Sequence, residues 1–431
     1  MLIQGGLVLD PATGRQGQLD IRVKEGKITE FGPNLAVSPG ETTVPAHGCI
    51  VAPGLVDIHV HFRDPGLTHK EDLISGSHAA AAGGFTTVVC MANTNPVPDL
   101  PERVHEFYNR AAREAVINLY TVGSVTYNLE GKQLTDFAAL KKAGVVGFSD
   151  DGNPVDNPAL VRHALEQAGA LGLPVINHCG ELALVADTIV NEGPAAKSLG
   201  LKGMPTTAED IHVARDVHLA ELTGQHVHIQ HVSSATAVSI IREAKARGVK
   251  VTAEAGPHHF TLTDAALLEY GPNAKMNPPL RTPADVAAVR QGLADGTLDA
   301  IATDHAPHTV EEKAQGLLEA PCGIVGLETA LGLVWTELVK PGILTPMQAI
   351  AKLTYIPANI VGLNKGTLAP GTAADITVFD PTSVWEVQPE KFFSKGRNTP
   401  FTGRRLTGKV ICTIVGGRTV FQNGNIVSPV H

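Results

Sequence analysis

Through the middle of the chain, short apolar segments alternate with longer segments whose apolar residues recur at helical spacing. The longer segments include 70–84, 158–172, 208–224 and 235–248, and each ends near a glycine that can cap a helix. Eight units of a strand followed by a helix predict an α/β fold, a parallel (β/α)8 barrel. The predicted strands lie at 54–62, 85–93, 116–125, 144–151, 173–179, 226–232, 249–256 and 298–307.

Both ends of the chain show a different pattern, in which short alternating segments are separated by turns. We therefore predict two domains: a discontinuous β domain built from residues 1–52 and 364–431, and a catalytic barrel of residues 53–363. A doubly wound sheet is the alternative for the middle of the chain. It normally carries fewer strands and a glycine-rich phosphate loop, and neither GxGxxG nor GxxxxGK[ST] occurs here.

Composition narrows the class of protein. Of the 431 residues, 43% are hydrophobic and 18% are charged, and the formal net charge is −9. No cluster of Lys and Arg stands out that would neutralise a phosphate backbone, so we expect no nucleic-acid partner. The first residues lack the basic region of a secretory signal, and no apolar run is long enough for a membrane helix, which predicts a cytoplasmic protein. Five cysteines stand singly, so neither a disulfide framework nor a thiolate zinc site is predicted.

Polar residues at the ends of the predicted barrel strands indicate metal chemistry, because the active site of such a barrel lies at the C-terminal ends of its strands. His59 and His61 end the first strand, and a period of two places both imidazoles on one face. Four further strand ends carry residues of the same type: Asp150 and Asp151, His178, His231 and Asp304. This joint placement predicts two divalent metal ions, with Zn²⁺ expected and Mn²⁺ or Co²⁺ also suited.

Taken one at a time, these histidines have a simpler structural interpretation. A lone His231 is more often a hydrogen-bonded core residue than a ligand, so the prediction depends on the coincidence of five strand ends. His226 and His228 alternate out of phase with His231, and we expect them to face the surrounding helices. His258 and His259 follow the seventh strand and are candidates for contacts to the ligands.

Two stretches of the chain resemble the signatures of a known enzyme superfamily. Residues 57–65 read Asp-Ile-His-Val-His-Phe-Arg-Asp-Pro, and residues 302–308 read Ala-Thr-Asp-His-Ala-Pro-His, followed by Lys313. Both resemble the motifs of the amidohydrolase superfamily and, within it, of the bacterial class I dihydroorotase family. The resemblance spans almost the whole chain. It implies a TIM-type (β/α)8 barrel with a small β-sandwich domain formed by both termini.

The resemblance also implies roles for individual residues. Strand parity alone leaves Asp150 and Asp151 open as the bridge between the metal ions; the family motif favours Asp151, and residues 145–151 contain no lysine that could be carboxylated. Asp304 is the implied catalytic proton carrier. The implied metal ligands are His59, His61 and Asp304 for one ion, and His178 and His231 for the other. The implied substrate contacts are His61, Phe62, Arg63, Asn93, Asn277, His308, Cys322 and Gly323.

The chemistry of Arg63 supports this set from the residues themselves. Arg63 lies two positions after His61, shares its face and offers a planar fork to a carboxylate, which predicts a small acid bound beside the metals. The alternative is a structural arginine in a salt bridge. Asn93 and Asn277 supply donors and acceptors that suit a ring with ureide N–H and C=O groups, although either can also cap a loop.

The function implied by the resemblance is that of a dihydroorotase, the reversible hydrolysis of L-dihydroorotate to N-carbamoyl-L-aspartate in pyrimidine synthesis. The alternatives are an allantoinase-like or dihydropyrimidinase-like cyclic amidohydrolase and, in a different class, an inactive chain that supports an aspartate transcarbamoylase. An active association with such a transcarbamoylase stays open, and we expect a homo-oligomer. Residues 306–322 leave the barrel mouth and are predicted to act as a lid.

Overall fold

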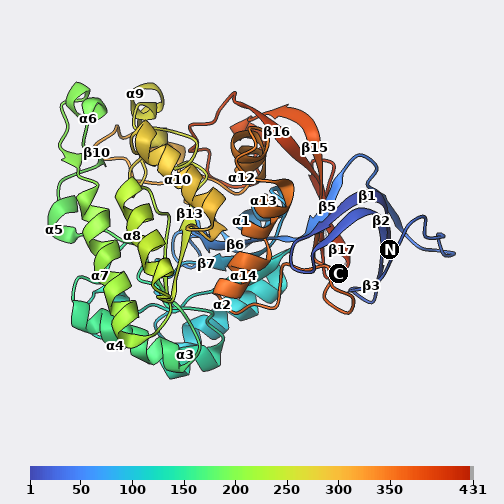
Figure 1. Ribbon diagram of the computed structural model, residues 1–431, viewed down its shortest axis with the longest axis horizontal. Helices are drawn as coiled ribbons and strands as arrows, with labels where there is room; N and C mark the ends of the chain where they lie inside the picture. Colours follow the sequence, from blue (N-terminus) through green and yellow to red (C-terminus); the bar gives the residue numbers. More distant parts are fainter. Residues whose placement is uncertain (428–431) are drawn as a thin grey trace.

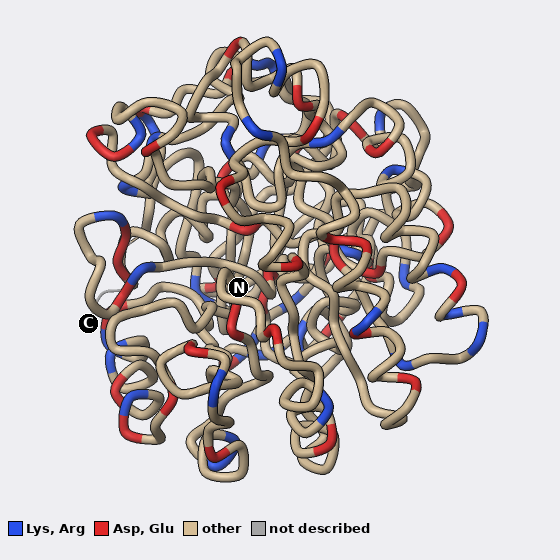
Figure 2. The backbone as a smooth tube through the Cα atoms, turned by 90° about the vertical axis from the view of Figure 1, so that its left-hand side faces the viewer, with Lys and Arg blue, Asp and Glu red and all other residues tan. Residues whose placement is uncertain are grey.

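The computed structural model describes residues 1–427, and Figure 1 shows a helix-covered barrel beside a sheet that contains both ends of the described chain. The last residues of the predicted C-terminal segment, 428–431, lie outside the described residues. In the view of Figure 2, basic and acidic residues are interspersed along the chain. Within residues 1–427, no helix is both long enough and apolar enough to cross a membrane.

The barrel strands are parallel and pair in sequence order, which confirms the predicted fold class. One group of three adjacent strands is β6 (Leu55–Val60), β7 (Phe85–Cys90) and β8 (Asn118–Thr121). A second group of four is β9 (Val175–Asn177), β12 (Val227–Ile229), β13 (Val251–Ala255) and β14 (Ala300–Ile301). A bridge between Val60 and His305 joins the first group to the end of the second.

The predicted fourth strand, 144–151, is shorter than expected. Only Phe148 forms a parallel bridge, to Gly123 on one side and Val175 on the other, and this single residue closes the ring. Phe148 donates its N–H to the Pro174 carbonyl at 3.1 Å, and its own carbonyl accepts the Ile176 N–H at 2.8 Å. Pro174 has no N–H with which to add the preceding bond, so the ladder does not extend before the start of β9. The carboxyl end of this segment still reaches the barrel mouth with the other strand ends.

Helices cover the outside of the barrel. Several begin with a side-chain cap, such as Asp72 before the first helix and Thr282 before α10, and several end at a left-handed glycine such as Gly144 or Gly224. The longer helices are α1 (Leu73–Ala82), α2 (Pro101–Glu114), α3 (Phe137–Ala143), α4 (Pro158–Ala170), α7 (Thr207–Thr223), α8 (Ala235–Ala246), α10 (Pro283–Asp295), α13 (Pro346–Lys352) and α14 (Tyr355–Ile360).

Shorter elements fill the connections between these units. They are α5 (Leu182–Val185), β10 (Val190–Asn191), α6 (Pro194–Ser198), β11 (Gly203–Met204), α9 (Ala266–Tyr270), α11 (Val310–Lys313) and α12 (Ala330–Val334), which continues into a π-helical turn, η3 (Trp335–Val339). Single 3₁₀ turns lie at η1 (Tyr127–Leu129), η2 (Gly271–Ala274) and η4 (Pro389–Lys391).

Strands from both ends of the chain form one nine-stranded sheet. Strand β5 (Ile50–Pro53) joins the two parts, because it pairs parallel with β1 (Leu2–Asp10) and antiparallel with β15 (Ile376–Glu386). Apolar residues from both parts, such as Ile21 and Ile414, share a core separate from the barrel core. The other strands are β1 (Leu2–Asp10), β2 (Arg15–Lys24), β3 (Lys27–Gly32), β4 (Thr43–Pro45), β15 (Ile376–Glu386), β16 (Arg405–Val415), β17 (Arg418–Gln422) and β18 (Asn425–Ile426).

Candidate metal centre and substrate pocket

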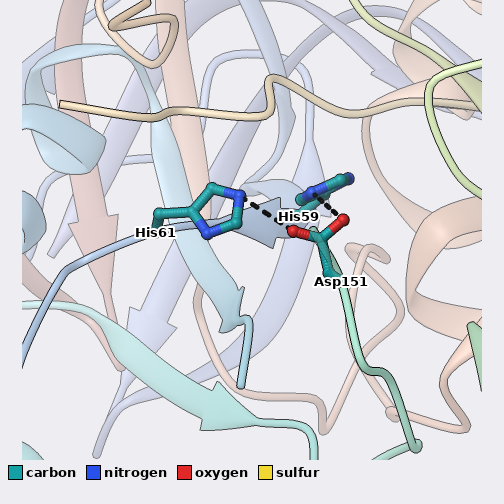
Figure 3. Close-up of side chains that lie close together, drawn as sticks. All are labelled: His59, His61 and Asp151. Atoms are coloured by element: carbon teal, nitrogen blue, oxygen red, sulfur yellow. Dashed lines mark ion pairs between the residues drawn. The ribbon is translucent and has the colours of Figure 1, made fainter. Parts of the chain in front are cut away.

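Three clusters of ligand-type side chains overlap at the barrel mouth. In each cluster the candidate ligand atoms lie within 4.8 Å of one another. The clusters are His59 with His61 and Asp151, His59 with His231 and Asp304, and Asp151 with His178 and His231. They therefore bring together all six residues that the sequence predicted as ligands. Figure 3 shows the first cluster, in which the Asp151 carboxylate lies between the two imidazole rings.

The spacing of these atoms suits small divalent ions. His61 Nε2 lies 3.0 Å from Asp304 Oδ1 and 3.3 Å from Asp151 Oδ2, and His59 Nε2 lies 3.4 Å from Asp304 Oδ1. Ligand atoms about 2.0–2.1 Å from a tetrahedral ion are roughly 3.3 Å apart. The group can thus enclose an ion without a large rearrangement.

Asp151 carries an atom that the protein itself leaves without a hydrogen bond. Among the described residues, its buried Oδ1 has no hydrogen-bond partner. The same atom lies 3.6 Å from His59 Nε2, 3.6 Å from His178 Nδ1 and 3.8 Å from His231 Nε2. An unsatisfied carboxylate oxygen at the centre of three imidazoles is costly unless a cation completes it. The donor set therefore fits a pair of divalent ions that share Asp151.

Asp150 has a different environment. Its Oδ1 accepts the backbone N–H groups of Val125 at 2.7 Å and Thr126 at 3.1 Å, and its Oδ2 accepts the Thr126 hydroxyl. These bonds hold the loop after β8. The structure thus turns Asp151, and not Asp150, toward the histidines, a choice that strand alternation had left open.

The electrostatics of the carboxylates follow from the histidines around them. Burial acts to raise the pKa of Asp151 and of Asp304, but the neighbouring imidazoles, His59 above all, outweigh it and hold each pKa well below its usual range. Both carboxylates are consequently ionised at neutral pH, the form in which they bind a cation or accept a proton.

Strained backbone accompanies the site. Arg63, His231 and Asp304 have φ values of 59°, 30° and 50°, in the left-handed region that non-glycine residues rarely adopt. Each lies where a strand has just ended, and the turn re-aims its side chain into the mouth. Such strain persists at functional positions where the surrounding structure enforces it.

The turn at His231 explains why the prediction for His226 and His228 was wrong. Regular alternation does not continue from β12 to His231, so the parity argument fails there. Both histidines contact polar side chains of β13 instead of the helices: His226 Nε2 donates to Thr252 Oγ1 at 2.7 Å, and Thr252 Oγ1 donates to His228 Nδ1 at 2.8 Å.

Glu254, on β13, is a functional candidate that sequence reasoning missed. Its carboxylate accepts His59 Nδ1–H at 2.6 Å and His228 Nε2–H at 3.0 Å, and all three residues are fully buried. Burial acts to raise the pKa of Glu254, but the lowering by His59 and His228 is larger, so the pKa lies below its ordinary value and the carboxylate stays ionised. The bond to Nδ1 leaves Nε2 of His59 free to face the cluster. Only its place on a strand facing the barrel interior could have indicated this role.

A cavity of about 210 Å³ opens beside the clusters. Its lining includes five of the six candidate metal ligands, all but His59. It also includes seven of the eight predicted substrate contacts: His61, Arg63, Asn93, Asn277, His308, Cys322 and Gly323. The eighth, Phe62, does not line it. The Phe62 ring lies so close to Gly76 of α1 that a Cβ there would come within 2.7 Å, and it packs edge-on against the His305 ring.

Arg63 is buried in this cavity without an acidic partner. It is 8% exposed, and within residues 1–427 no carboxylate lies within ion-pair distance of its guanidinium. Its nearest polar neighbours are His308 Nε2 at 3.3 Å and the Pro307 carbonyl at 3.4 Å. Burial lowers the pKa of Arg63. The neighbouring Asp64 pairs with Arg110 instead, so the structure does not support a salt-bridged structural role for Arg63.

Two other lining residues are oriented by their neighbours. Asn93 Oδ1 accepts His61 Nδ1–H at 2.8 Å, which directs Nε2 of that ring toward Asp151 and Asp304. His308 Nε2 donates to the Cys322 carbonyl at 2.8 Å. Burial and the adjacent Arg63 lower the pKa of His308 to about 3, so its ring is neutral.

The two remaining histidines near the mouth differ in their contacts. His259 Nε2 donates to the Pro278 carbonyl at 3.1 Å and so holds the loop that carries Asn277. The His258 ring packs on the His259 ring, with centroids 4.2 Å apart. His259 therefore supports the pocket through its loop.

A fourth cluster, Cys179 with His212 and Asp216, lies beside the guanidinium of Arg215. Arg215 Nε donates to Asp216 Oδ1 at 2.9 Å, which neutralises the carboxylate. The cluster binds the chain before and after His178: the Asn177 side-chain amide donates to Asp216 at 2.8 Å, and the Gly180 N–H donates to His212 at 3.2 Å. It supports the His178 loop rather than offering another metal site.

Comparison with known proteins agrees with this architecture. The model of a family described as Dihydro-orotase-like matches residues 48–237, and that of the Amidohydrolase family matches residues 212–421. Among solved structures, an L-hydantoinase (dihydropyrimidinase) from Arthrobacter aurescens superposes with a TM-score of 0.90 at 25% identity, covering 99% of this chain and 97% of its own. Fold and site together define a metal-dependent amidohydrolase.

Curated relatives make the assignment more specific. A dihydroorotase of Pelotomaculum thermopropionicum is 53% identical over 98% of this chain and 99% of its own length. A dihydroorotase of Geobacter sp. is 50% identical over 98% of this chain and 100% of its own length. The chain belongs to the dihydroorotase family.

Proposed function

We propose that this chain catalyses the reversible hydrolysis of L-dihydroorotate to N-carbamoyl-L-aspartate. The observation that carries the proposal is Arg63, a buried guanidinium with no acidic partner among the described residues, in the wall of a cavity next to the histidine–carboxylate clusters. A buried cation is costly unless an anion completes it. The ring carboxylate of dihydroorotate would supply that anion at each binding event.

The proposed metal assignment is the one that the family resemblance implies, and the overlap of the clusters supports it. His59, His61 and Asp304 would hold one divalent ion and His178 and His231 the other, with Asp151 between them, and Zn²⁺ suits this mixture of imidazole and carboxylate ligands. When bound, such ions supply Lewis acidity and lower the pKa of a coordinated water. Glu254 and Asn93 would fix the orientation of the imidazoles that face the ions.

Asp304 is the candidate proton carrier. It lines the cavity, and its pKa is held low, so that it is ionised and able to accept a proton from the attacking water. Ring opening requires a proton on the departing ring nitrogen, and Asp304 would return it there. In the direction of ring closure the same carboxylate carries the proton the opposite way.

The other lining residues would hold the ring. Arg63 and the neutral His308 lie together at the carboxylate end, 3.3 Å apart. Asn93, Asn277 and the backbone of Cys322 and Gly323 provide donors and acceptors for the ureide groups. A contact through Phe62 would have to come from its backbone, because its ring lies against Gly76.

The second candidate is a hydantoinase-like or allantoinase-like activity, which the TM-score of 0.90 to the Arthrobacter aurescens L-hydantoinase favours. The substrate ring of a dihydropyrimidinase carries no carboxylate that Arg63 could bind. The test is to quantify bound metals and to measure turnover of dihydroorotate, hydantoin and allantoin by one preparation. We expect two ions per chain and a strong preference for dihydroorotate; a preference for hydantoin or allantoin would overturn the proposal.

Several finer statements stay predictions. An inactive chain would have lost metal ligands, whereas all six candidates are in place here. Self-association and binding to an aspartate transcarbamoylase are testable by size-exclusion chromatography of the chain alone and mixed with that enzyme. The cytoplasmic location, the domain boundaries at residues 52 and 364, and closure of residues 306–322 as a lid are likewise predictions.

A further inference from the structure

Between β15 and β16 the chain leaves the terminal sheet and crosses to the barrel. Residues 387–404 make this excursion. Near its centre the Ser394 hydroxyl and the Lys395 N–H, at 3.2 Å, both donate to Glu71, which also accepts His305 Nε2–H at 3.2 Å. The N–H of Phe393 donates to Glu328 at 3.0 Å. The excursion is thus anchored on two barrel carboxylates beside the mouth.

Asn398 lies four residues beyond Ser394 and is 3% exposed. Its Oδ1 accepts the His308 N–H at 3.1 Å, and its Nδ2 donates to the carbonyls of Ala306 and Gly323, each at 3.0 Å. Its own carbonyl accepts the Val325 N–H at 3.0 Å. Both amide donors and the amide acceptor are therefore used, and every partner is main chain.

These partners lie in two segments beside the substrate cavity that also pair directly with each other, because the Ala306 N–H donates to the Ile324 carbonyl at 2.8 Å. Ala306 and His308 form one wall, and Cys322 and Gly323 form the other. The walls approach so closely that a Cβ on Gly323, which has φ of 113°, would lie 2.6 Å from the Ala306 Cβ. The amide of Asn398 crosses this junction and reinforces the pairing of the two walls with hydrogen bonds to both.

We propose that Asn398 is a positioning residue for substrate binding, through which the terminal domain completes the catalytic pocket. The inference deepens the proposed function and rests on it for the identity of the substrate. Asn398 sets the backbone from which His308 reaches the Cys322 carbonyl, at 2.8 Å, and His308 in turn lies beside Arg63. None of the Asn398 partners belongs to the metal-binding clusters. Its contribution therefore falls on the carboxylate end of the cavity.

The test compares two variants of the full-length, metal-loaded protein. Asn398→Ala removes all three side-chain bonds, and Asn398→Asp keeps the shape but sets a carboxylate oxygen against two carbonyls. We expect each to raise the KM for dihydroorotate about 10- to 100-fold, because small misplacements of binding groups cost this much. The metal content should stay at the wild-type value, and kcat should fall much less than KM rises. A folded variant with a KM within about twofold of wild type would overturn the proposal.

Asn118 provides a matched control. It is also an asparagine that links the barrel to the terminal domain, since its Nδ2 donates to Asp375 at 3.1 Å and to the Thr86 carbonyl at 2.9 Å. It lies at the start of β8, at the opposite end of the barrel from the cavity. Asn118→Ala should lower stability and leave KM unchanged. An equal rise of KM in this variant would show that any loss of domain contact weakens binding, and would contradict a specific role for Asn398.

A measurement on backbone amides keeps the inference independent of activity and of variant stability. Hydrogen exchange at 306–308 and 322–325 should be faster in Asn398→Asp than in wild type, and dihydroorotate should slow exchange at 393–399 in the wild type. If the wild type neither binds nor turns over dihydroorotate, the proposed function fails, while faster exchange at both walls in Asn398→Asp would still support the positioning role. Unchanged exchange at both walls in Asn398→Asp, or at 393–399 on binding, would overturn it.

Discussion

Asp150 and Asp151, adjacent residues at the end of the fourth barrel segment, make different contacts. Asp151 directs a carboxylate with an unsatisfied oxygen at three imidazoles, whereas Asp150 binds the backbone and hydroxyl of the loop after β8. Both carboxylates are buried, but burial raises the pKa of Asp150 to about 6, while the histidines hold that of Asp151 low. The difference comes from their neighbours and is open to direct test.

We expect Asp151→Asn to lower the metal content below two ions per chain and to abolish turnover, because the bridging charge is lost. Asp150→Asn should retain both ions and lower the free energy of unfolding by about 1–3 kcal/mol through weakened loop bonds. Metal analysis and denaturant unfolding of both variants measure these effects. The reverse pattern would assign the bridge to Asp150, and unchanged metal content in both would contradict the two-metal arrangement.

At this scale, sequence reasoning identified residues whose position in a strand determines their direction. His59 and His61, two positions apart, both reach the cluster as predicted, although the register of β6 against β7 shifts between Asp57 and Val60. Alternation failed at His231, where φ is positive, and the orientation of His228 was therefore assigned wrongly. Glu254 and Asn398 could not be identified, because their partners are far away in sequence: His59 is 195 residues from Glu254, and His308 is 90 residues from Asn398.

Among the elements, the strand and helix order was predictable because each unit carries its own hydrophobic period and glycine stop. The fourth strand was overestimated, since its apolar residues satisfy the pattern although Pro174 on the neighbouring strand interrupts the ladder. Hydrogen bonds between residues of different elements were not predictable. An example is Lys352, at the end of α13, which is buried and donates to the Leu298 carbonyl at 2.6 Å just before β14.

The burial of Lys352 predicts a pH-dependent stability. Burial lowers its pKa to about 8 from an ordinary value of 10.5. Between these values the unfolded chain binds a proton that the folded chain does not, so this group's contribution to stability rises with pH in that window and is least favourable below pH 8. Relative to Lys352→Met, the wild type should gain on the order of 2 kcal/mol between pH 8 and 10.5.

Denaturant unfolding at several pH values measures this difference. Lys132→Met is the matched control, because the Lys132 side chain is 79% exposed and is therefore not desolvated on folding. A Lys352→Met difference that is flat across the same window would show that the ammonium is not desolvated in the folded protein.

For the whole molecule, the barrel supplies the ligand clusters, and residues 387–404, between two strands of the terminal sheet, pack beside the substrate cavity. Metal binding should therefore stabilise the fold as well as support activity. The carboxylates of Asp151 and Asp304 both lie close to His61 at the mouth of the barrel, and bound divalent ions would neutralise their negative charge.

Removal of metal by a chelator should abolish turnover and lower the unfolding temperature, because an ion that binds only the folded state stabilises it by mass action. Adding back two equivalents of Zn²⁺ should restore both. Calorimetry and a dihydroorotate assay on the same samples follow the two effects. Full activity in thoroughly chelated protein would contradict a metal-dependent mechanism.

The most direct test of the central claim is the selectivity of the cavity for a ring that carries a carboxylate. Arg63→Met should lower kcat/KM for dihydroorotate by the equivalent of about 2–5 kcal/mol and change the inhibition constant of 5,6-dihydrouracil, the same ring without the carboxylate, far less. Arg110→Met, which removes the partner of Asp64 outside the cavity, should leave this selectivity unchanged. Equal losses for both rings in Arg63→Met would contradict the claim that Arg63 binds the substrate carboxylate.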